Sequence, residues 1–205
     1  MSVEGIYDHY KDNFGKGLTN DRILDWENRE CQEIRFSILK NFIEDNHLRD
    51  FTLLDVGCGL ADLYDYLNRF DIHANYTGID ILPQMIDLAQ QQHPDLCLIA
   101  GDIFNNDISD NVFPERFDIV YSSGIFNIDL GNNYDFLRNA VKRFISLSKR
   151  YVVFNLLADT SLDKEAGYFY FNKQRVETLL SECKITDYKI ITGYLHNDMS
   201  VVINL

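Results

Sequence analysis

The chain has 205 residues, of which 46% are hydrophobic and 25% charged, a composition typical of a folded globular protein. Its net charge of −13 disfavours a protein that coats nucleic-acid phosphates or binds an anionic membrane surface. The four cysteines include no CxxC pair, so neither a zinc site nor a disulfide framework is expected. No signal peptide and no membrane-spanning apolar run is present. We therefore expect a cytoplasmic protein that binds a small molecule, with no nucleic acid, no membrane and no metal.

Hydrophobic spacing divides the chain into alternating helices and strands. Helical periodicity predicts helices over residues 28–46, 60–67, 83–91, 133–148 and 173–183. Apolar runs bounded by turn residues predict strands over residues 51–56, 76–80, 96–100, 117–122, 151–157, 187–195 and 199–205. The alternation predicts an α/β fold with a doubly wound, seven-stranded, mostly parallel sheet. Only a His196-Asn197-Asp198 turn separates the last two strands, so they must pair as an antiparallel hairpin or not at all.

Residues 28–205 are interpreted as a single domain, preceded by an N-terminal segment of residues 1–27. Aromatic residues are frequent in this segment, which predicts a helical lid over a binding site; plain surface packing is the alternative. Tyr7, His9 and Tyr10 are candidates for a proton acceptor there. Further candidates of this kind are Tyr134, His196 and Asp198.

Ligands of doubly wound sheets bind outside the carboxyl ends of the strands. The first strand ends in Asp-Val-Gly-Cys-Gly at residues 55–59, whose glycines permit close approach of a ligand; a plain strand-to-helix turn is the alternative. Asp80 ends the second strand, where a carboxylate can accept hydrogen bonds from ribose hydroxyls or cap the helix that begins near Pro83. Asp102 ends the third strand beside Ile103 and Phe104, a set suited to adenine or to a turn with core neighbours.

Two polar residues fall inside the apolar face of the predicted helix 28–46. At about 100° per residue, Gln32 and Arg35 lie on the same side as Leu39 and Phe42. A buried guanidinium needs an acceptor. The acceptor of Arg35 is either a ligand carboxylate or a structural acid, and a position at the helix edge is a third possibility.

Four segments together resemble the class I S-adenosylmethionine-dependent methyltransferases, in particular a group of small uncharacterised bacterial members. They are LLDVGCGLAD from residue 53, YTGID from 76, LIAGD from 98 and FDIVYSSGIF from 117. The resemblance covers about residues 50–157 and implies a Rossmann-like methyltransferase fold. It also implies S-adenosylmethionine as cofactor and S-adenosylhomocysteine as product.

The resemblance implies a role for each matching residue. Gly57 and Gly59 would pass under the methionine moiety, and Asp55 would organise the turn. Asp80 would bind the ribose hydroxyls. The remaining residues carried over are Ile81, Asp102 and Ile103 at the adenine, and Ser122 below the sulfonium. The full predicted cofactor set is Gln32, Arg35, Asp55, Gly57, Cys58, Gly59, Asp80, Ile81, Asp102, Ile103, Phe104 and Ser122.

The residues after the fourth predicted strand exclude some acceptors. Residues 122–126, Ser-Ser-Gly-Ile-Phe, carry neither the Asn/Asp-Pro-Pro-aromatic motif of nucleic-acid amino-methyltransferases nor a nucleophilic Pro-Cys. We expect direct in-line transfer to a small molecule, with protein methylation or non-catalytic cofactor binding as alternatives. Nicotinamide chemistry is disfavoured because Asp62 replaces the third glycine of G-x-G-x-x-G. The aromatic stretch 166–171 either lines the acceptor pocket or packs the core. Nothing in the sequence indicates the oligomeric state.

Overall fold

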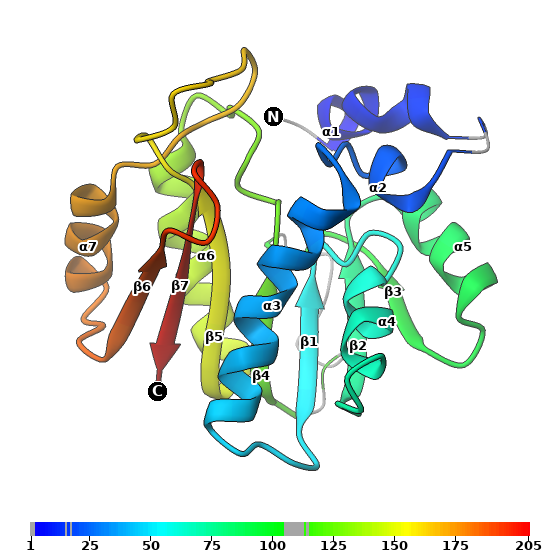
Figure 1. The fold of residues 1–205 in the computed structure, drawn as a ribbon, viewed down its shortest axis with the longest axis horizontal. Coiled ribbons are helices and arrows are strands. Elements are labelled where there is room, and N and C mark those ends of the chain that lie inside the picture. Colours follow the sequence, from blue (N-terminus) through cyan, green and yellow to red (C-terminus); the bar gives the residue numbers. More distant parts are fainter. Residues whose placement is uncertain (1–2, 15, 17, 105–112, 114) are drawn as a thin grey trace.

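The strands form one seven-stranded sheet, in the order β3-β2-β1-β4-β5-β7-β6, in a computed structural model of the chain (Figure 1). The structure describes residues 3–14, 16, 18–104, 113 and 115–205. The strands are β1 (Thr52–Val56), β2 (Asn75–Asp80), β3 (Cys97–Ala100), β4 (Phe117–Ser122), β5 (Ser148–Leu157), β6 (Tyr188–Thr192) and β7 (Asp198–Asn204). The helices are α1 (Val3–Tyr10), the 3-10 turn η1 (Lys11–Asn13), α2 (Asn20–Ile23), α3 (Arg29–Asp45), α4 (Asp62–Asn68), α5 (Pro83–Gln92), α6 (Asn133–Leu147) and α7 (Lys173–Glu182).

The five strands β1 to β5 run parallel, and β7 pairs antiparallel with both β5 and β6. The doubly wound, mostly parallel seven-stranded fold and its C-terminal antiparallel hairpin are therefore confirmed. Several boundaries differ from the sequence-based expectation, and two of them concern β5 and β7. β5 begins at Ser148 rather than at residue 151, and Asp198 starts β7 instead of belonging to the turn. Asp198 pairs with Leu157 of β5, whereas the hairpin of β6 and β7 ends at the pair Thr192–Met199.

Strand alternation divides the core between the two faces of the sheet. Leu53 of β1 packs with α3 and α4 on one face, whereas Leu54 packs with α6 and α7 on the other. Because successive strand side chains point to opposite faces, a strand buried on both sides reads as a continuous apolar run. That is why β1 and β4 were recognisable as short apolar segments. Both helical layers hold the carboxyl ends of β1 to β4 in fixed positions.

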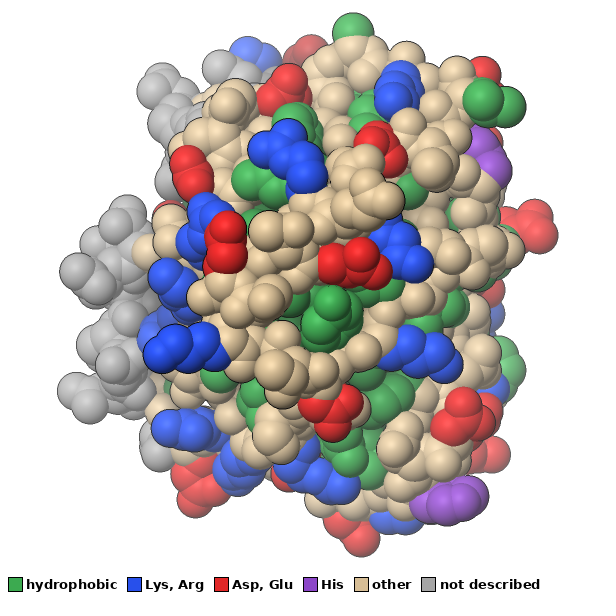
Figure 2. Space-filling model, turned by 90° about the vertical axis from the view of Figure 1, so that its left-hand side faces the viewer, with side chains coloured by type: hydrophobic (Ala, Val, Ile, Leu, Met, Phe, Trp, Pro, Cys, Tyr) green, Lys and Arg blue, Asp and Glu red, His purple; other side chains and the backbone are tan. Residues whose placement is uncertain are grey.

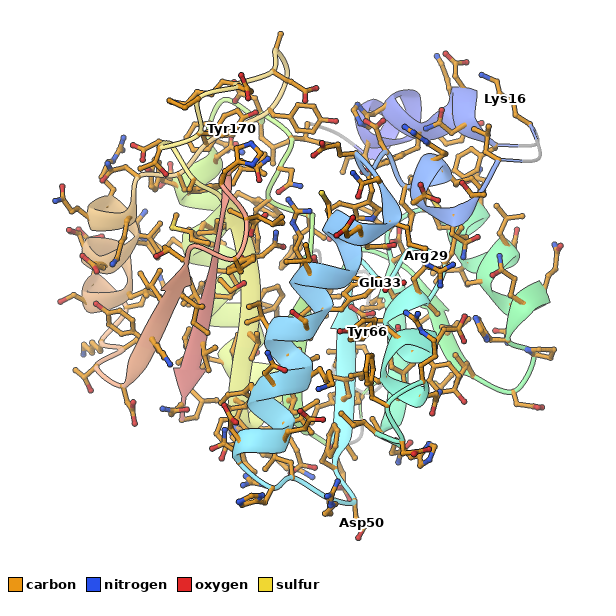
Figure 3. All side chains as sticks on the ribbon, in the orientation of Figure 1. Lys16, Arg29, Glu33, Asp50, Tyr66 and Tyr170 are labelled. Atoms are coloured by element: carbon orange, nitrogen blue, oxygen red, sulfur yellow. The ribbon has the colours of Figure 1, made fainter. Side chains whose placement is uncertain are left out.

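Two segments lie at the carboxyl end of the parallel strands. One consists of α1, η1 and α2, and the other is the β5–α7 loop, residues 158–172 (Figure 1). Figure 3 labels one residue of each: Tyr170 in the loop and Lys16 in the N-terminal segment lie at this same end. The loop is held to the segment after β4, because Asp129 N–H donates to Gly167 O and Phe169 N–H to Asn127 O. Both segments are therefore placed to cover a site at the strand ends.

The edge of the sheet formed by β6 and α7 presents a mixed surface. Figure 2 shows that Lys and Arg side chains are interspersed with Asp and Glu there. This side of the molecule therefore carries charges of both signs. None of the helices in the described residues combines the length and apolar character needed to cross a membrane.

Candidate functional site

A cavity of about 430 Å³ lies at the carboxyl ends of β1 to β4. The loops after all four strands line it, and Tyr10, Leu24 and Trp26 of the N-terminal segment cover it. Five carboxylates lie in its wall: Asp25, Asp55, Asp62, Asp80 and Asp102. In the part of the chain that the structure describes, the wall contains no Lys, Arg or His. The cavity is therefore a site for a neutral or cationic ligand with apolar parts.

The turn after β1 requires its glycines. Gly57 and Gly59 have φ angles of +74° and +53°, in the left-handed region. A Cβ at Gly57 would lie 2.2 Å from Cγ2 of Ile125, and one at Gly59 would lie 2.5 Å from Cδ2 of Leu24. Both glycines line the cavity, so the turn brings bare backbone to its wall. Cys58 between them also lines the cavity, and burial raises the pKa of its thiol well above the usual value.

Asp55 is a buried acid in the floor of this turn. Tyr76 Oη donates a hydrogen bond of 2.6 Å to Asp55 Oδ2, and only 3% of Asp55 is exposed. Burial raises the pKa of Asp55 to about 7, although the hydrogen bond from Tyr76 acts to lower it. Asp55 is therefore a carboxyl group that titrates near neutral pH in the wall of the cavity.

Asp80 connects two loops of the cavity wall. Its Oδ2 accepts a hydrogen bond of 2.9 Å from Gly59 N–H, and its Oδ1 accepts one of 3.0 Å from Leu82 N–H. Leu82, not Asp80, is the N-cap residue of α5, and no side chain caps that helix. Burial raises the pKa of Asp80, against the hydrogen bonds from Leu82 and Gly59, which lower it. The carboxylate thus fixes the glycine turn while it lines the cavity.

The loop after β3 contributes one acid and two apolar side chains. Asp102 Oδ1 accepts a hydrogen bond of 2.9 Å from Phe104 N–H, which closes a tight turn. Asp102, Ile103 and Phe104 all line the cavity, as does Ile81 after β2. The structure therefore brings together at one wall the four residues assigned to adenine or its surroundings.

Arg35 does not line the cavity, in contrast to the expectation that it holds a cofactor carboxylate. Its Nε donates a 2.6 Å hydrogen bond to Oδ2 of buried Asp198, and Nη1 donates to Cys31 O. Of the alternatives for Arg35, the structural acid is therefore the one observed. Because Asp198 is paired with Arg35, it is no longer a candidate proton acceptor. Gln32 does line the cavity, where its Nε2 donates to Asp62 Oδ2 at 3.0 Å.

Ser122 also lies outside the cavity wall, and its predicted place below the sulfonium is corrected here. It is fully buried, and its Oγ donates a hydrogen bond of 2.8 Å to Val56 O. The next residues, Ser123 and Gly124, line the cavity instead. Sequence identifies the strand end but not which of two successive serines faces the ligand, because side chains alternate along a strand.

Of the three proton-acceptor candidates in the N-terminal segment, only Tyr10 lines the cavity. Tyr7 is 36% exposed and stacks on Phe14. His9 lies behind the wall, with Nε2 3.1 Å from Asp25 Oδ2.

Sequence reasoning missed Asp25 and Asn127, both of which line the cavity. The sequence did not decide whether the aromatic stretch 166–171 lines the pocket or packs the core. In the structure it does both, because Tyr168 lines the cavity and Phe171 is fully buried in the core.

Comparison with known proteins agrees with this geometry. A family described as "Methyltransferase domain" matches residues 53–144, the stretch that forms β1 to α6 and most of the cavity wall. This stretch of the chain is therefore similar to a methyltransferase domain. The curated relative "Putative methyltransferase Rv1506c" of Mycobacterium tuberculosis (strain ATCC 25618 / H37Rv) is 32% identical over 80 residues, 39% of this chain. The match spans 45% of that relative, less than half of its length.

Solved methyltransferases share the whole fold at low sequence identity. Magnesium protoporphyrin IX methyltransferase from Synechocystis PCC 6803, with bound S-adenosylhomocysteine, aligns with a TM-score of 0.69 and 14% identity over 98% of this chain and 95% of its own. The N-methyltransferase NodS from Bradyrhizobium japonicum WM9, in complex with S-adenosylhomocysteine, aligns with a TM-score of 0.66 and 17% identity over 97% of each chain. At these identities the likeness establishes the methyltransferase fold alone.

Proposed function

We propose that the protein transfers a methyl group from S-adenosylmethionine to a small-molecule acceptor. The observation that carries the proposal is the set of residues at the ends of β1, β2 and β3, which fits an adenosyl cofactor part by part. Gly57 and Gly59 present bare backbone to the cavity, and a Cβ on either would collide with Ile125 or Leu24. When bound, the cofactor supplies an electrophilic methyl group on a positively charged sulfur.

Each wall residue then has a defined task. Asp80, already fixed by Gly59 and Leu82, accepts hydrogen bonds from the ribose hydroxyls. Ile81 and Ile103 supply apolar surface for the adenine ring, and Asp102 accepts from its amino group. Methionine-moiety contacts come from the backbone of the glycine turn and from Gln32, in place of Arg35.

The charge of the cavity supports the same cofactor. S-adenosylmethionine carries a sulfonium and an ammonium against a single carboxylate. Five acidic side chains in a wall without described basic ones complement that net positive charge. A pyrophosphate-bearing cofactor such as NADH would meet an electrostatic barrier in the same cavity.

A small acceptor is favoured because the N-terminal segment and the β5–α7 loop cover the cavity. Tyr10 and Trp26 line it from the first, and Tyr168 lines it from the second. A protein side chain would have to pass both segments to reach the strand ends. Methylation occurs here by positioning the acceptor in line with the reactive methyl group, and excluding water protects that geometry.

Calorimetric titration tests the cofactor assignment. We expect micromolar binding of S-adenosylmethionine and S-adenosylhomocysteine and no binding of NADH. A second assay follows S-adenosylhomocysteine formation with either the low-molecular-weight fraction or the protein fraction of a bacterial extract as acceptor. Turnover with the small-molecule fraction alone supports the proposal. Turnover only with the protein fraction, or binding without turnover, would replace it by protein methylation or by a cofactor-binding module.

A further inference from the structure

Asp25 is fixed where three parts of the cavity cover meet. Its Oδ2 accepts a hydrogen bond of 2.7 Å from Tyr168 Oη of the β5–α7 loop, and lies 3.1 Å from Nε2 of His9 on α1. The residue stands between α2 and α3 with a φ angle of +57°. That left-handed conformation is unfavourable for most residues and is tolerated best by Asn, Asp and Gly. The turn is thus built to hold a short acidic side chain at this point.

One oxygen of this carboxylate remains open to a ligand. Within the described residues, no protein group donates a hydrogen bond to Asp25 Oδ1, and Asp25 lines the cavity with 47% of its side chain exposed. The basic side chain beside it is His9, which lies behind the wall, and no described basic side chain lines the cavity itself. Arg35, which lies over the Trp26 ring, is itself paired with Asp198.

A second acceptor lies in the wall on the β4 side. Oδ1 of Asn127 is buried and has no hydrogen-bond partner, and Asn127 lines the same cavity. Phe169 N–H donates to the main-chain oxygen of Asn127, so the backbone of this residue is tied to the loop that carries Tyr168. An unpartnered buried acceptor costs free energy unless a ligand supplies a donor. Asp25 and Asn127 therefore both present acceptor oxygens to the cavity, and the buried oxygen of Asn127 lacks a donor.

Aromatic rings complete this part of the wall. Tyr10 and Tyr168 both line the cavity, and the His9 ring contacts each of them edge-on. The electron-rich face of an aromatic ring attracts a cation, and it also packs against apolar substituents. Acceptor oxygens, a negative charge and tyrosine rings are together complementary to an alkylammonium group.

We propose that the methyl acceptor is an amine, bound as an ammonium ion that donates hydrogen bonds to Asp25 and Asn127. This assignment rests on the proposed methyltransferase function. Before transfer, the ammonium gives one proton to the Asp25 carboxylate, whose side chain is 47% exposed and releases the proton to water. The lone pair on nitrogen then forms the N–C bond while the C–S bond breaks and its electron pair stays on sulfur. The products are the N-methylammonium ion and S-adenosylhomocysteine.

The test is calorimetry on the protein saturated with S-adenosylhomocysteine, with probe pairs that differ in charge but little in shape. The pairs are benzylamine with benzyl alcohol and n-butylamine with 1-butanol. We expect the cation of at least one pair to bind ten-fold or more tightly than its neutral partner. Asp25→Asn should abolish that preference, Tyr168→Phe should reduce it, and Asp163→Asn, on the exposed part of the same loop, should leave it unchanged.

The outcomes separate the two proposals. If S-adenosylhomocysteine itself does not bind, the proposed function fails before any amine is tested. If it binds equally to wild type and Asp25→Asn but no cation exceeds its neutral partner, the amine assignment alone is overturned. A cation preference that survives in folded Asp25→Asn also overturns it, because the charge then comes from elsewhere. Thermal melting of each variant establishes that it is folded, and Tyr168→Phe tests the same contact while the charge is kept.

Discussion

Arg35 and Asp198 form a buried ion pair that reaches the wall of the cofactor cavity. Nε of Arg35 lies 2.6 Å from Oδ2 of Asp198, with side-chain exposures of 6% and 0%. Asn155 Nδ2 donates to the same carboxylate, while Asn155 Oδ1 accepts a hydrogen bond of 2.9 Å from Gly124 N–H. The Arg35 guanidinium lies over the Trp26 ring, with Cζ of Arg35 4.9 Å from the ring centroid. The pair therefore supports Gly124 and Trp26, two residues of the cavity wall, without lining the cavity.

The first prediction is that Arg35→Leu destabilises the fold. It leaves a buried carboxylate without its cation, which costs about 3–5 kcal/mol of unfolding free energy. Adding Asp198→Asn should recover a large part of that loss, because the unpaired charge is then removed. Urea denaturation of the two single variants and the double variant measures the coupling. Arg29→Leu breaks an exposed pair on the same helix, where Arg29 contacts Glu33, and should cost less than about 1 kcal/mol.

Strict additivity of the two substitutions would contradict this interpretation of the pair. So would a stable Arg35→Leu protein that has lost cofactor affinity, since that result would return Arg35 to the ligand.

The second prediction concerns Asp80. Asp80→Ala removes the acceptor for the ribose hydroxyls and releases both Gly59 N–H and Leu82 N–H. We expect the affinity for S-adenosylhomocysteine to fall by about 2–4 kcal/mol in calorimetry. Asp87→Ala, on the exposed face of α5, removes the same charge and should change the affinity less than two-fold. Unchanged affinity in a folded Asp80→Ala protein would limit Asp80 to holding the two loops.

The third prediction is a pH dependence caused by Asp55. Burial raises its pKa to about 7, whereas in the unfolded chain the carboxyl group ionises near its ordinary pKa of 3.8. Between these values the native state binds more protons than the unfolded state, so stability falls as pH rises and levels off above about 7. Asp55→Asn cannot ionise but can still accept from Tyr76. It should match the wild type near pH 4 and exceed it near pH 7 by up to about 4 kcal/mol.

Asp118 supplies a control of opposite sign. Partial burial opposes its ionisation, but hydrogen bonds from the backbone and hydroxyl of Thr52 outweigh that effect and lower its pKa. Asp118→Asn should therefore lose stability relative to the wild type at neutral pH and regain it as the pH falls. Both predictions are tested by measuring the unfolding free energy of the ligand-free proteins between about pH 4 and 7. If the stability of Asp55→Asn and of the wild type changes in parallel with pH, the role given to Asp55 is wrong.

The fourth prediction separates backbone strain from steric contact at the glycine turn. Gly193→Ala meets nothing within 4 Å and has a φ of +86°, so it should cost only the left-handed strain, about 1–2 kcal/mol. Gly59→Ala adds a Cβ at 2.5 Å from Leu24, so its cost should be greater by at least about 1 kcal/mol. Its affinity for S-adenosylhomocysteine should also fall. If thermal denaturation gives the same loss of stability for both variants, the Leu24 side chain moves aside without cost and the steric argument is wrong.

The strand ends could be predicted from sequence because local patterns define them. β1 and β4 are apolar on both faces. The turn after β1 has left-handed backbone at residues 57 and 59, where glycine is the residue that adopts it most readily. By contrast, the partner of Arg35 lies 163 residues away in a strand that polarity placed in a turn. Helical periodicity established that Arg35 is buried, but burial does not identify a partner.

Asp25 was missed for the same reason. Its contact with Tyr168 spans 143 residues, and neither residue stands in a recognisable motif. Only the sheet, by bringing the loop after β5 over the N-terminal segment, makes them neighbours. The residues proposed to bind the cofactor can be recognised in local sequence, whereas those proposed to face the acceptor depend on contacts formed by the complete fold.

The central claim is that an adenosyl cofactor occupies the cavity at the ends of β1 to β4. A crystal structure of the protein grown with S-adenosylhomocysteine tests it most directly. We predict the ribose hydroxyls on Asp80, the adenine between Ile81 and Ile103, and its amino group on Asp102. A ligand bound elsewhere, or a ribose without contact to Asp80, would contradict the account.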